Sequence, residues 1–277
     1  MENEKIIDIP PIKGYLDYQE RKNTSIKAII IYILIMYAFN TIVQFILLGI
    51  APIITGYDLY ELNELGEKVI NAQNNIFINS WTQIIVYVAL TISLIYISKH
   101  YLIEDLKASK NNIKKIIIQI LIGFGIFYIS SIASSIFLWI FKINDSSANQ
   151  NALIEIVTGK YGPLVLFTIV LLGPLCEEII FRQSAFNLFK PGTKPWIKIT
   201  ITGAVFGFIH VVTAILSYIL MEEHYSVILK EFLLGIPYIL QGIALSFIYH
   251  RSQNNIVPTA IIHILNNLLA AIVIFIQ

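Results

Sequence analysis

Seven predominantly apolar stretches follow one another along the chain, and each is close to the roughly 20 residues that an α-helix needs to cross the hydrocarbon core of a membrane. They cover residues 28–50, 80–98, 116–141, 162–180, 199–220, 227–249 and 256–276. The fourth is expected to continue as helix towards Lys190, because Pro191 and Gly192 end it there. The sequence therefore predicts an all-α fold, a polytopic membrane helix bundle of about seven transmembrane helices.

The composition agrees with this fold and excludes several classes of function. Of 277 residues, 56% are hydrophobic and 13% are charged, whereas soluble domains carry about 25% charged residues. The surplus apolar surface must face lipid. A net charge of +1 gives no electrostatic reason to expect a nucleic-acid partner. The single cysteine, Cys176, excludes an internal disulfide and a cysteine-based zinc site.

We divide the chain into three parts. Residues 1–27 are polar and charged and are expected to form a cytoplasmic N-terminal segment. Residues 28–150 hold the first transmembrane helices, and residues 151–277 form a C-terminal transmembrane core that contains the polar motifs described below. The loop at 51–79 is acidic and rich in Asn, and we expect a short surface helix near residues 59–70.

Lysine and arginine are distributed unevenly over the loops. With the N-terminus inside, the cytoplasmic segments hold fifteen of the 19 residues, and the outer side holds the other four: Lys68, Lys142, Lys160 and Lys230. Cytoplasmic loops of membrane proteins carry an excess of these residues. The sequence therefore predicts an integral membrane protein of the plasma membrane, with its N-terminus in the cytoplasm and its C-terminus outside.

Ionisable residues inside the apolar stretches gather in the C-terminal part of the chain. The fourth stretch carries Glu177, Glu178 and Arg182, the fifth carries His210, and the seventh carries His263. An ionisable side chain at mid-membrane costs about 2.5–3.5 kcal/mol on insertion scales, so it usually has a function or a partner. The first three stretches contain none at comparable depth. This asymmetry indicates a functional site in the C-terminal helices.

Three of these residues lie at a common depth. Three charges at the cytoplasmic boundary give the depth: Glu177 lies thirteen residues before Lys190, His210 lies twelve residues after Lys198, and His263 lies twelve residues after Arg251. At a rise of 1.5 Å per residue, all three lie roughly 18–20 Å from that boundary. A shared site requires such a common level for its carboxylate and its two imidazoles.

Helical spacing separates the two adjacent carboxylates. Glu178 and Arg182 stand at i and i+4 with the glutamate first, which is the order that favours an ion pair. Glu177 is rotated by about 100° from Glu178, so it faces another partner. Asn267 stands four residues after His263 and shares its helix face.

These residue types suit the hydrolysis of a peptide bond inside a membrane. Glutamate can activate a water as general base and return the proton as general acid, and the amide of Asn267 can donate to an oxyanion. The two imidazoles can hold that water or, together with Glu177, a zinc ion. The candidate metal ligands are therefore Glu177, His210 and His263, and the residues leave open whether the water is bound to a metal.

At these positions the sequence resembles the CAAX-protease and bacteriocin-processing family of intramembrane proteases, also called CPBP or Abi. The motifs of that family are Glu-Glu-x-x-x-Arg, Phe-x-x-x-His and His-x-x-x-Asn on successive helices. Here they read Glu177-Glu178-Ile-Ile-Phe-Arg182, Phe206-Gly-Phe-Ile-His210 and His263-Ile-Leu-Asn-Asn267. The resemblance covers residues 160–277, whereas residues 1–150 share only their apolar character.

The resemblance implies an intramembrane endopeptidase, either glutamate-dependent or metal-dependent, of the CAAX-protease, bacteriocin-processing or immunity type. It implies that Glu177 activates water and that Glu178 assists or pairs with Arg182. By the same resemblance, the catalytic site is completed by His210, His263 and Asn267. The implied substrate is a membrane-embedded or lipid-anchored peptide or protein in the lipid bilayer, and zinc is the candidate cofactor.

Two other classes of function stay open. A proton-coupled transporter would also bury Glu and His in a helix bundle, although it would usually show paired halves with interrupted helices. A non-catalytic bacteriocin-immunity or scaffold protein would use the same fold. Other protease types are excluded, because all five aspartates lie outside the apolar stretches and no His-Glu-x-x-His sequence occurs. Three further ionisable residues near helix ends are expected at the membrane interface: His224, Glu231 and His250.

Overall fold

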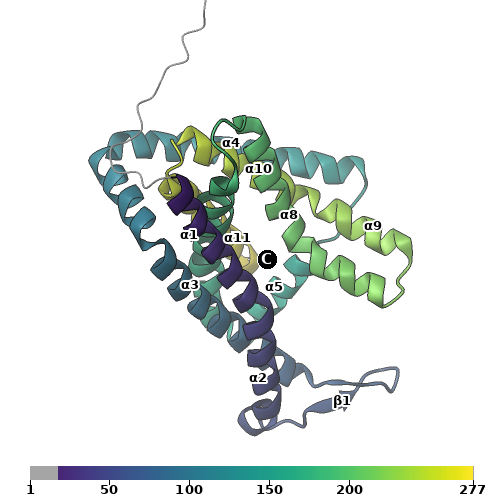
Figure 1. Ribbon diagram of the computed structural model, residues 1–277. Helices are drawn as coiled ribbons and strands as arrows, with labels where there is room; N and C mark the ends of the chain where they lie inside the picture. Colours follow the sequence, from purple (N-terminus) through teal and green to yellow (C-terminus); the bar gives the residue numbers. More distant parts are fainter. Residues whose placement is uncertain (1–17, 277) are drawn as a thin grey trace, which may run out of the picture.

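The computed structural model of the protein describes residues 18–276, and residues 1–17 and 277 lie outside the described residues. Within this range seven helical stretches are long and apolar enough to cross a membrane, which confirms the predicted all-α bundle. They cover Tyr18–Thr55, Ala72–Asn111, Ile113–Ile140, Gly162–Leu188, Pro195–Leu220, Tyr225–Arg251 and Ile256–Phe275. Figure 1 shows the bundle, with the small hairpin at β1 standing apart from it.

The N-terminal part of the structure contains three of these stretches. Its elements are α1 (Tyr18–Ile33), the π-helical η1 (Leu34–Phe39), α2 (Asn40–Thr55), β1 (Tyr60–Leu62), β2 (Lys68–Ile70), α3 (Ala72–Asn111) and α4 (Ile113–Ile140). The first helix begins at Tyr18, so the predicted cytoplasmic segment 1–27 is helical over its last residues. Polar residues extend this helix beyond its apolar stretch, and apolar length alone therefore underestimated it.

The loop between α2 and α3 is a hairpin, so the short helix expected near residues 59–70 is wrong. Strands β1 and β2 pair in antiparallel register. Between them, Asn63 Oδ1 accepts hydrogen bonds from the backbone N–H groups of Leu65 (3.0 Å) and Glu67 (2.8 Å). Gly66 has a φ of 77°, a left-handed conformation that glycine adopts without steric cost. An Asn side chain bonded to its own following backbone reverses the chain and interrupts a helix.

The C-terminal part contains the other four spanning stretches and one short helix outside them. Its elements are α5 (Ala148–Thr158), α6 (Gly162–Phe167), the π-helical η2 (Thr168–Leu172), α7 (Gly173–Glu177), the π-helical η3 (Glu178–Ser184), the 3₁₀-helical η4 (Ala185–Leu188), α8 (Pro195–Leu220), α9 (Tyr225–Leu234), α10 (Ile236–Arg251) and α11 (Ile256–Ile276). The stretch from α6 to η4 runs to Leu188, as predicted. Helix α5 was missed because its 11 residues are too few for a span.

Helices α8 and α10 pack backbone against backbone, and this contact fixes the position of α8 in the site. A Cβ atom built on Gly207 would lie 2.3 Å from the backbone nitrogen of Ile239, and one on Gly203 would lie 2.5 Å from that of Ile243. Only glycine leaves room for such an approach, which is common between membrane helices. The residue between these glycines in the packed face, Phe206, is thereby held against the neighbouring helices.

The charge distribution gives a testable topology for these seven spans. An odd number of spans places the two termini on opposite sides, and the charge bias places the N-terminus inside. We expect a reporter fused after Gln277 to report an outer location. A matched fusion in the turn at Ser252 between α10 and α11 is expected to report the cytoplasm. A cytoplasmic signal from the C-terminal fusion would contradict this topology.

Candidate active site

The two adjacent glutamates lie in the most irregular helical stretch of the protein. Glu177 is the last residue of α7, and Glu178 is the first residue of the π-helical η3. Pro174 stands one turn earlier, where it cannot donate a backbone hydrogen bond. Single π-helical turns inside α-helices occur frequently at functional sites. The irregular backbone therefore coincides with the residues that the sequence analysis selected.

Glu178 is the centre of a buried polar cluster. Its side chain has no exposed surface, and its Oε1 atom lies 3.2 Å from Arg182 Nη1, the i+4 partner expected from the sequence. The same oxygen lies 3.0 Å from His263 Nδ1 on α11. Arg182 is also fully buried, and its Nη2 atom donates to the Gly242 carbonyl at 3.5 Å. The cluster thus joins η3 to α10 and α11.

Glu177 differs from its neighbour in being accessible. Its side chain is 17% exposed, and its Oε2 atom lies 3.6 Å from His263 Nε2. This separation is too long for a direct hydrogen bond, and polar contacts of this length are commonly bridged by water. Glu177 therefore faces an open position beside His263, whereas Glu178 is enclosed by its partners.

Both histidines have one ring nitrogen occupied and the other available. His210 Nδ1 lies 2.7 Å from the Phe206 carbonyl, which can only accept, so Nδ1 carries the proton. In His263 the Nδ1 atom lies against the Glu178 carboxylate, and an ionised carboxylate likewise accepts. The second nitrogen, Nε2, then has a free lone pair in each neutral ring. The two imidazoles can therefore accept a proton or bind a metal through Nε2.

Phe206 connects the charged and the imidazole side chains. The Arg182 guanidinium lies 4.5 Å from the centre of its ring, a distance typical of a cation–π contact. The ring centres of His210 and His263 lie 4.7 Å and 5.9 Å from that of Phe206. The aromatic residue of the second motif thus packs between the buried cation and both histidines, and it fixes their relative positions.

Asn267 is held by the backbone of the fourth spanning stretch. In the π-helical register of η2, the Gly173 N–H group donates to the Thr168 carbonyl, five residues earlier. The next carbonyl, that of Ile169, would receive its bond from Pro174, which has no N–H group. Asn267 Nδ2 donates to this Ile169 carbonyl at 3.0 Å instead. The asparagine of the third motif therefore satisfies an acceptor that the proline leaves unpaired.

This arrangement predicts that Asn267 and Pro174 are energetically coupled. Asn267→Ala is expected to lower stability by about 1–3 kcal/mol, because the Ile169 carbonyl loses its donor. Adding Pro174→Ala supplies a backbone N–H group and is expected to recover part of that loss. Melting temperatures of the two single variants and the double variant in detergent form the double-mutant cycle. Asn111→Ala, which changes an exposed asparagine at the end of α3, is the control, and strictly additive effects would contradict the coupling.

Glu177, His210 and His263 are residue types that bind zinc, but the structure does not place the three side chains around a single ion. Two imidazole Nε2 atoms and the Glu177 carboxylate are a donor set found in catalytic zinc sites. The Nδ1 atom of His210 bonds to a carbonyl and that of His263 to a carboxylate, as is usual for metal-binding histidines. Over residues 18–276, however, no group of three or more His, Cys, Asp or Glu side chains is placed to hold one ion.

The structure also adds residues that the sequence analysis did not select. Tyr238 on α10 stacks on His210, with ring centres 4.7 Å apart and an angle of 12° between the planes. Its hydroxyl group lies 2.9 Å from Ser147 Oγ, which caps α5. Glu231 is 4% exposed and accepts from the Ala148 N–H group at 3.1 Å, so it joins α9 to the start of α5. No spacing rule links these residues, because they meet only through the fold.

Comparison with known proteins agrees with the geometry of the site. Residues 160–269 match the family model described as "Type II CAAX prenyl endopeptidase Rce1-like". All three polar motifs, from Glu177 to Asn267, fall within the matched residues. This region is Rce1-like. The resemblance to CAAX-type intramembrane proteases is thereby confirmed for the Rce1-like region, and the helices before it lie outside the match.

Two curated relatives extend over most of the chain. An uncharacterized protein of Mycoplasma capricolum subsp. capricolum is 28% identical over 222 residues, which are 74% of this chain and 59% of that protein. "Putative membrane peptidase YdiL" of Bacillus subtilis is 26% identical over 219 residues, which are 78% of this chain and 79% of that protein. No solved structure matches significantly. The aligned part of the chain thus spans just over half of the Mycoplasma relative.

The Rce1-like match, the membrane peptidase relative and the seven spans support one general conclusion. The protein is an integral membrane protein, and its residues 160–269 are similar to CAAX-protease-like intramembrane peptidases.

Proposed function

We propose that the protein is an intramembrane endopeptidase that hydrolyses a peptide bond in a membrane-associated peptide or protein. Glu177 activates a water molecule that His210 and His263 hold in place. The observation that carries the proposal is the contrast between the two glutamates. Glu177 is accessible and lies 3.6 Å from His263 Nε2, whereas Glu178 is enclosed by Arg182 and the other nitrogen of His263.

The proposed reaction uses this arrangement in two proton transfers. Glu177 takes a proton from water, and the resulting hydroxide forms a bond to the carbonyl carbon of the scissile amide. The tetrahedral intermediate collapses when the C–N bond breaks and the proton passes from Glu177 to the leaving amine. The second O–H group of the water donates to the Nε2 atom of His263 or of His210, which orients the water beside Glu177. Asn267 uses one N–H group for Ile169 and has a second that can donate to the oxyanion.

Zinc is the second part of the proposal that needs a direct test. If zinc binds, Glu177, His210 and His263 would have to close around it from the arrangement described above, and it would supply a bound water of lowered pKa. Hydrolysis of a lipid-anchored peptide should then be lost in chelator and restored by zinc alone. Activity that survives exhaustive chelation would assign the reaction to Glu177 without a metal.

The proposed substrate is a membrane-embedded or lipid-anchored polypeptide in the plasma membrane, of the CAAX, bacteriocin-precursor or immunity-related type. The Rce1-like match supports this class, because the matched family is described as a prenyl endopeptidase. Purified wild type and Glu177→Gln protein in detergent, incubated with a farnesylated peptide and with apolar membrane peptides, test it by mass spectrometry. Cleavage by neither protein, with both folded, would favour a non-catalytic immunity or scaffold role.

A further inference from the structure

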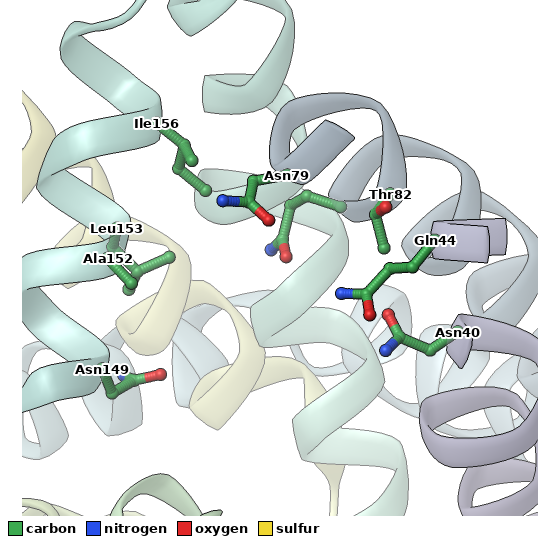
Figure 2. A pocket seen from close by; sticks show the side chains of 9 residues that line it. Asn40, Gln44, Asn79, Thr82, Asn149, Ala152, Leu153 and Ile156 are labelled. Atoms are coloured by element: carbon green, nitrogen blue, oxygen red, sulfur yellow. The ribbon is translucent and has the colours of Figure 1, made fainter. Parts of the chain in front are cut away.

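A second polar feature lies among the membrane helices, on the outer side of the site by the charge-based topology. It is a cavity of about 210 Å³ between α2, α3 and α5. Figure 2 shows side chains of α2 on one side of it and side chains of α5 on the other. Its polar lining consists of Asn40, Gln44, Asn79, Thr82, Gln83 and Asn149, and its other lining residues are apolar.

The lining is neutral, and much of its hydrogen-bonding capacity is unused. No charged residue lines the cavity. Asn79 donates to Asn75 at 3.1 Å, but among the described residues no partner bonds the amide groups of the other four. Thr82 is 5% exposed, and its hydroxyl oxygen is buried without a hydrogen-bond partner within residues 18–276. Gln44 is exposed and the other four amide side chains are partly buried, so the unpaired group that is costly away from water is the Thr82 hydroxyl. A polar occupant of the cavity would satisfy this hydroxyl and the amides around it.

The cavity and the candidate site share one face of α3. Asn79, Gln83 and Tyr87 stand at i, i+4 and i+8 and therefore lie along one side of that helix. Tyr87 lies against the fourth spanning stretch, because its ring carbon Cε1 would be 3.5 Å from a Cβ atom built on Gly173. One turn further, Thr91 Oγ1 lies 3.1 Å from the sulfur of Cys176, the residue before Glu177. A molecule that extends from the level of Cys176 and Glu177 along α3 would thus enter the cavity at Gln83 after about two helical turns, or roughly 12 Å.

The chemistry of the lining selects an occupant that is neutral and offers both donors and acceptors. Each Asn or Gln side chain carries two N–H donors and a carbonyl acceptor, which match the N–H and C=O groups of a peptide. A substrate segment must leave its helical conformation to be cleaved, and in the membrane its backbone groups then need new partners. An ionic ligand such as a phosphate or a metal ion would find no counter-charge among these residues.

We infer that the amide-lined cavity binds the main chain of an extended substrate segment on the outer side of the scissile bond. This inference rests on the proposed function and adds a binding site to it. Recognition runs through backbone groups, so it tolerates many side-chain sequences. The substrate class is therefore a polypeptide whose cleaved segment extends towards the outer face of the membrane.

Binding of a synthetic peptide to the full-length Glu177→Gln protein tests this inference without turnover. The probe is a fluorescein-labelled apolar membrane peptide with a central Gly-Ser-Gly segment, and its partner is the same peptide with that segment N-methylated. N-methylation removes N–H donors but keeps the side chains. We expect it to weaken binding by roughly tenfold or more, the effect of losing one or two hydrogen bonds. Equal affinity of the two peptides, or no binding of either, would overturn the inference.

Cavity variants locate the effect. Gln44→Leu on α2 and Gln83→Leu on α3, each added to Glu177→Gln, are expected to lose the preference for the unmethylated peptide. Gln73→Leu is the matched control, because Gln73 is an exposed amide on α3 outside the cavity. Melting temperatures identify a variant that fails to fold. In that case the affinities of the two peptides for the Glu177→Gln protein, whose cavity is unchanged, still test the inference. Preference retained in both folded variants would contradict the cavity as the binding site.

The outcome separates this inference from the proposed function. Cleavage of a peptide by the wild type together with equal binding of both probes would leave the hydrolytic function standing and remove the cavity from it. Main-chain-dependent binding without any cleavage by the wild type would support the cavity as a peptide-binding site and contradict the hydrolytic function.

Discussion

Replacing Glu177 with Gln is expected to lower peptide turnover by about 10²–10⁴-fold and to leave the melting temperature nearly unchanged. Glutamine keeps the shape of the side chain but cannot accept the proton of water. The folding effect is expected to be small, because Glu177 is 17% exposed and forms no direct hydrogen bond with His263 at 3.6 Å. Cleavage rate and melting temperature, measured on the same preparation in detergent, check both parts.

A matched control and a reversal test make this prediction specific. Glu64→Gln changes an exposed glutamate in the hairpin loop and is expected to alter neither quantity. If Glu177→Gln retained activity while Glu178→Gln were stable and inactive, the roles of the two carboxylates would have to be exchanged.

Most of the correct predictions from the sequence rested on two properties, the length of the apolar stretches and the period of the α-helix. Each spanning stretch was found because a helix in lipid must be apolar over a fixed length, and this requirement does not depend on neighbouring helices. The pairing of Glu178 with Arg182 was found for a similar reason, because i and i+4 residues meet within one helix. The structure contains that pair at 3.2 Å.

The contacts between helices could not be predicted in the same way. His263 Nδ1 bonds to the Glu178 carboxylate, and Asn267 Nδ2 donates to the Ile169 carbonyl, because the fold packs α11 against η2 and η3. The second contact also depends on the π-helical register before Pro174, which no periodicity rule reveals. The contact of Glu231 with Ala148 was not predicted for the same reason, since Ala148 belongs to the unpredicted helix α5.

The second large effect is expected at Glu178, and it concerns stability. Glu178→Gln leaves the Arg182 guanidinium fully buried without its ionised partner. Breaking a buried ion pair from one side costs about 3–5 kcal/mol, because an uncompensated charge remains in an apolar environment. We therefore expect a large fall in melting temperature and yield. Glu104→Gln is the control, because its contact with Arg21 at 3.6 Å is partly exposed and such pairs contribute about 0–1 kcal/mol.

Arg182→Met, added to Glu178→Gln, is expected to recover part of the lost stability, because it removes the buried charge and keeps an apolar side chain of similar length. Recovery should be incomplete, since Arg182 also contacts the Phe206 ring and the Gly242 carbonyl. Glutamine at 178 can still accept from His263 Nδ1 through its amide oxygen. A double variant that keeps His263 in place and is more stable than Glu178→Gln alone would identify Glu178 as the architectural carboxylate. A double variant less stable than either single variant would instead mean that the charge pair itself holds η3 against α10 and α11.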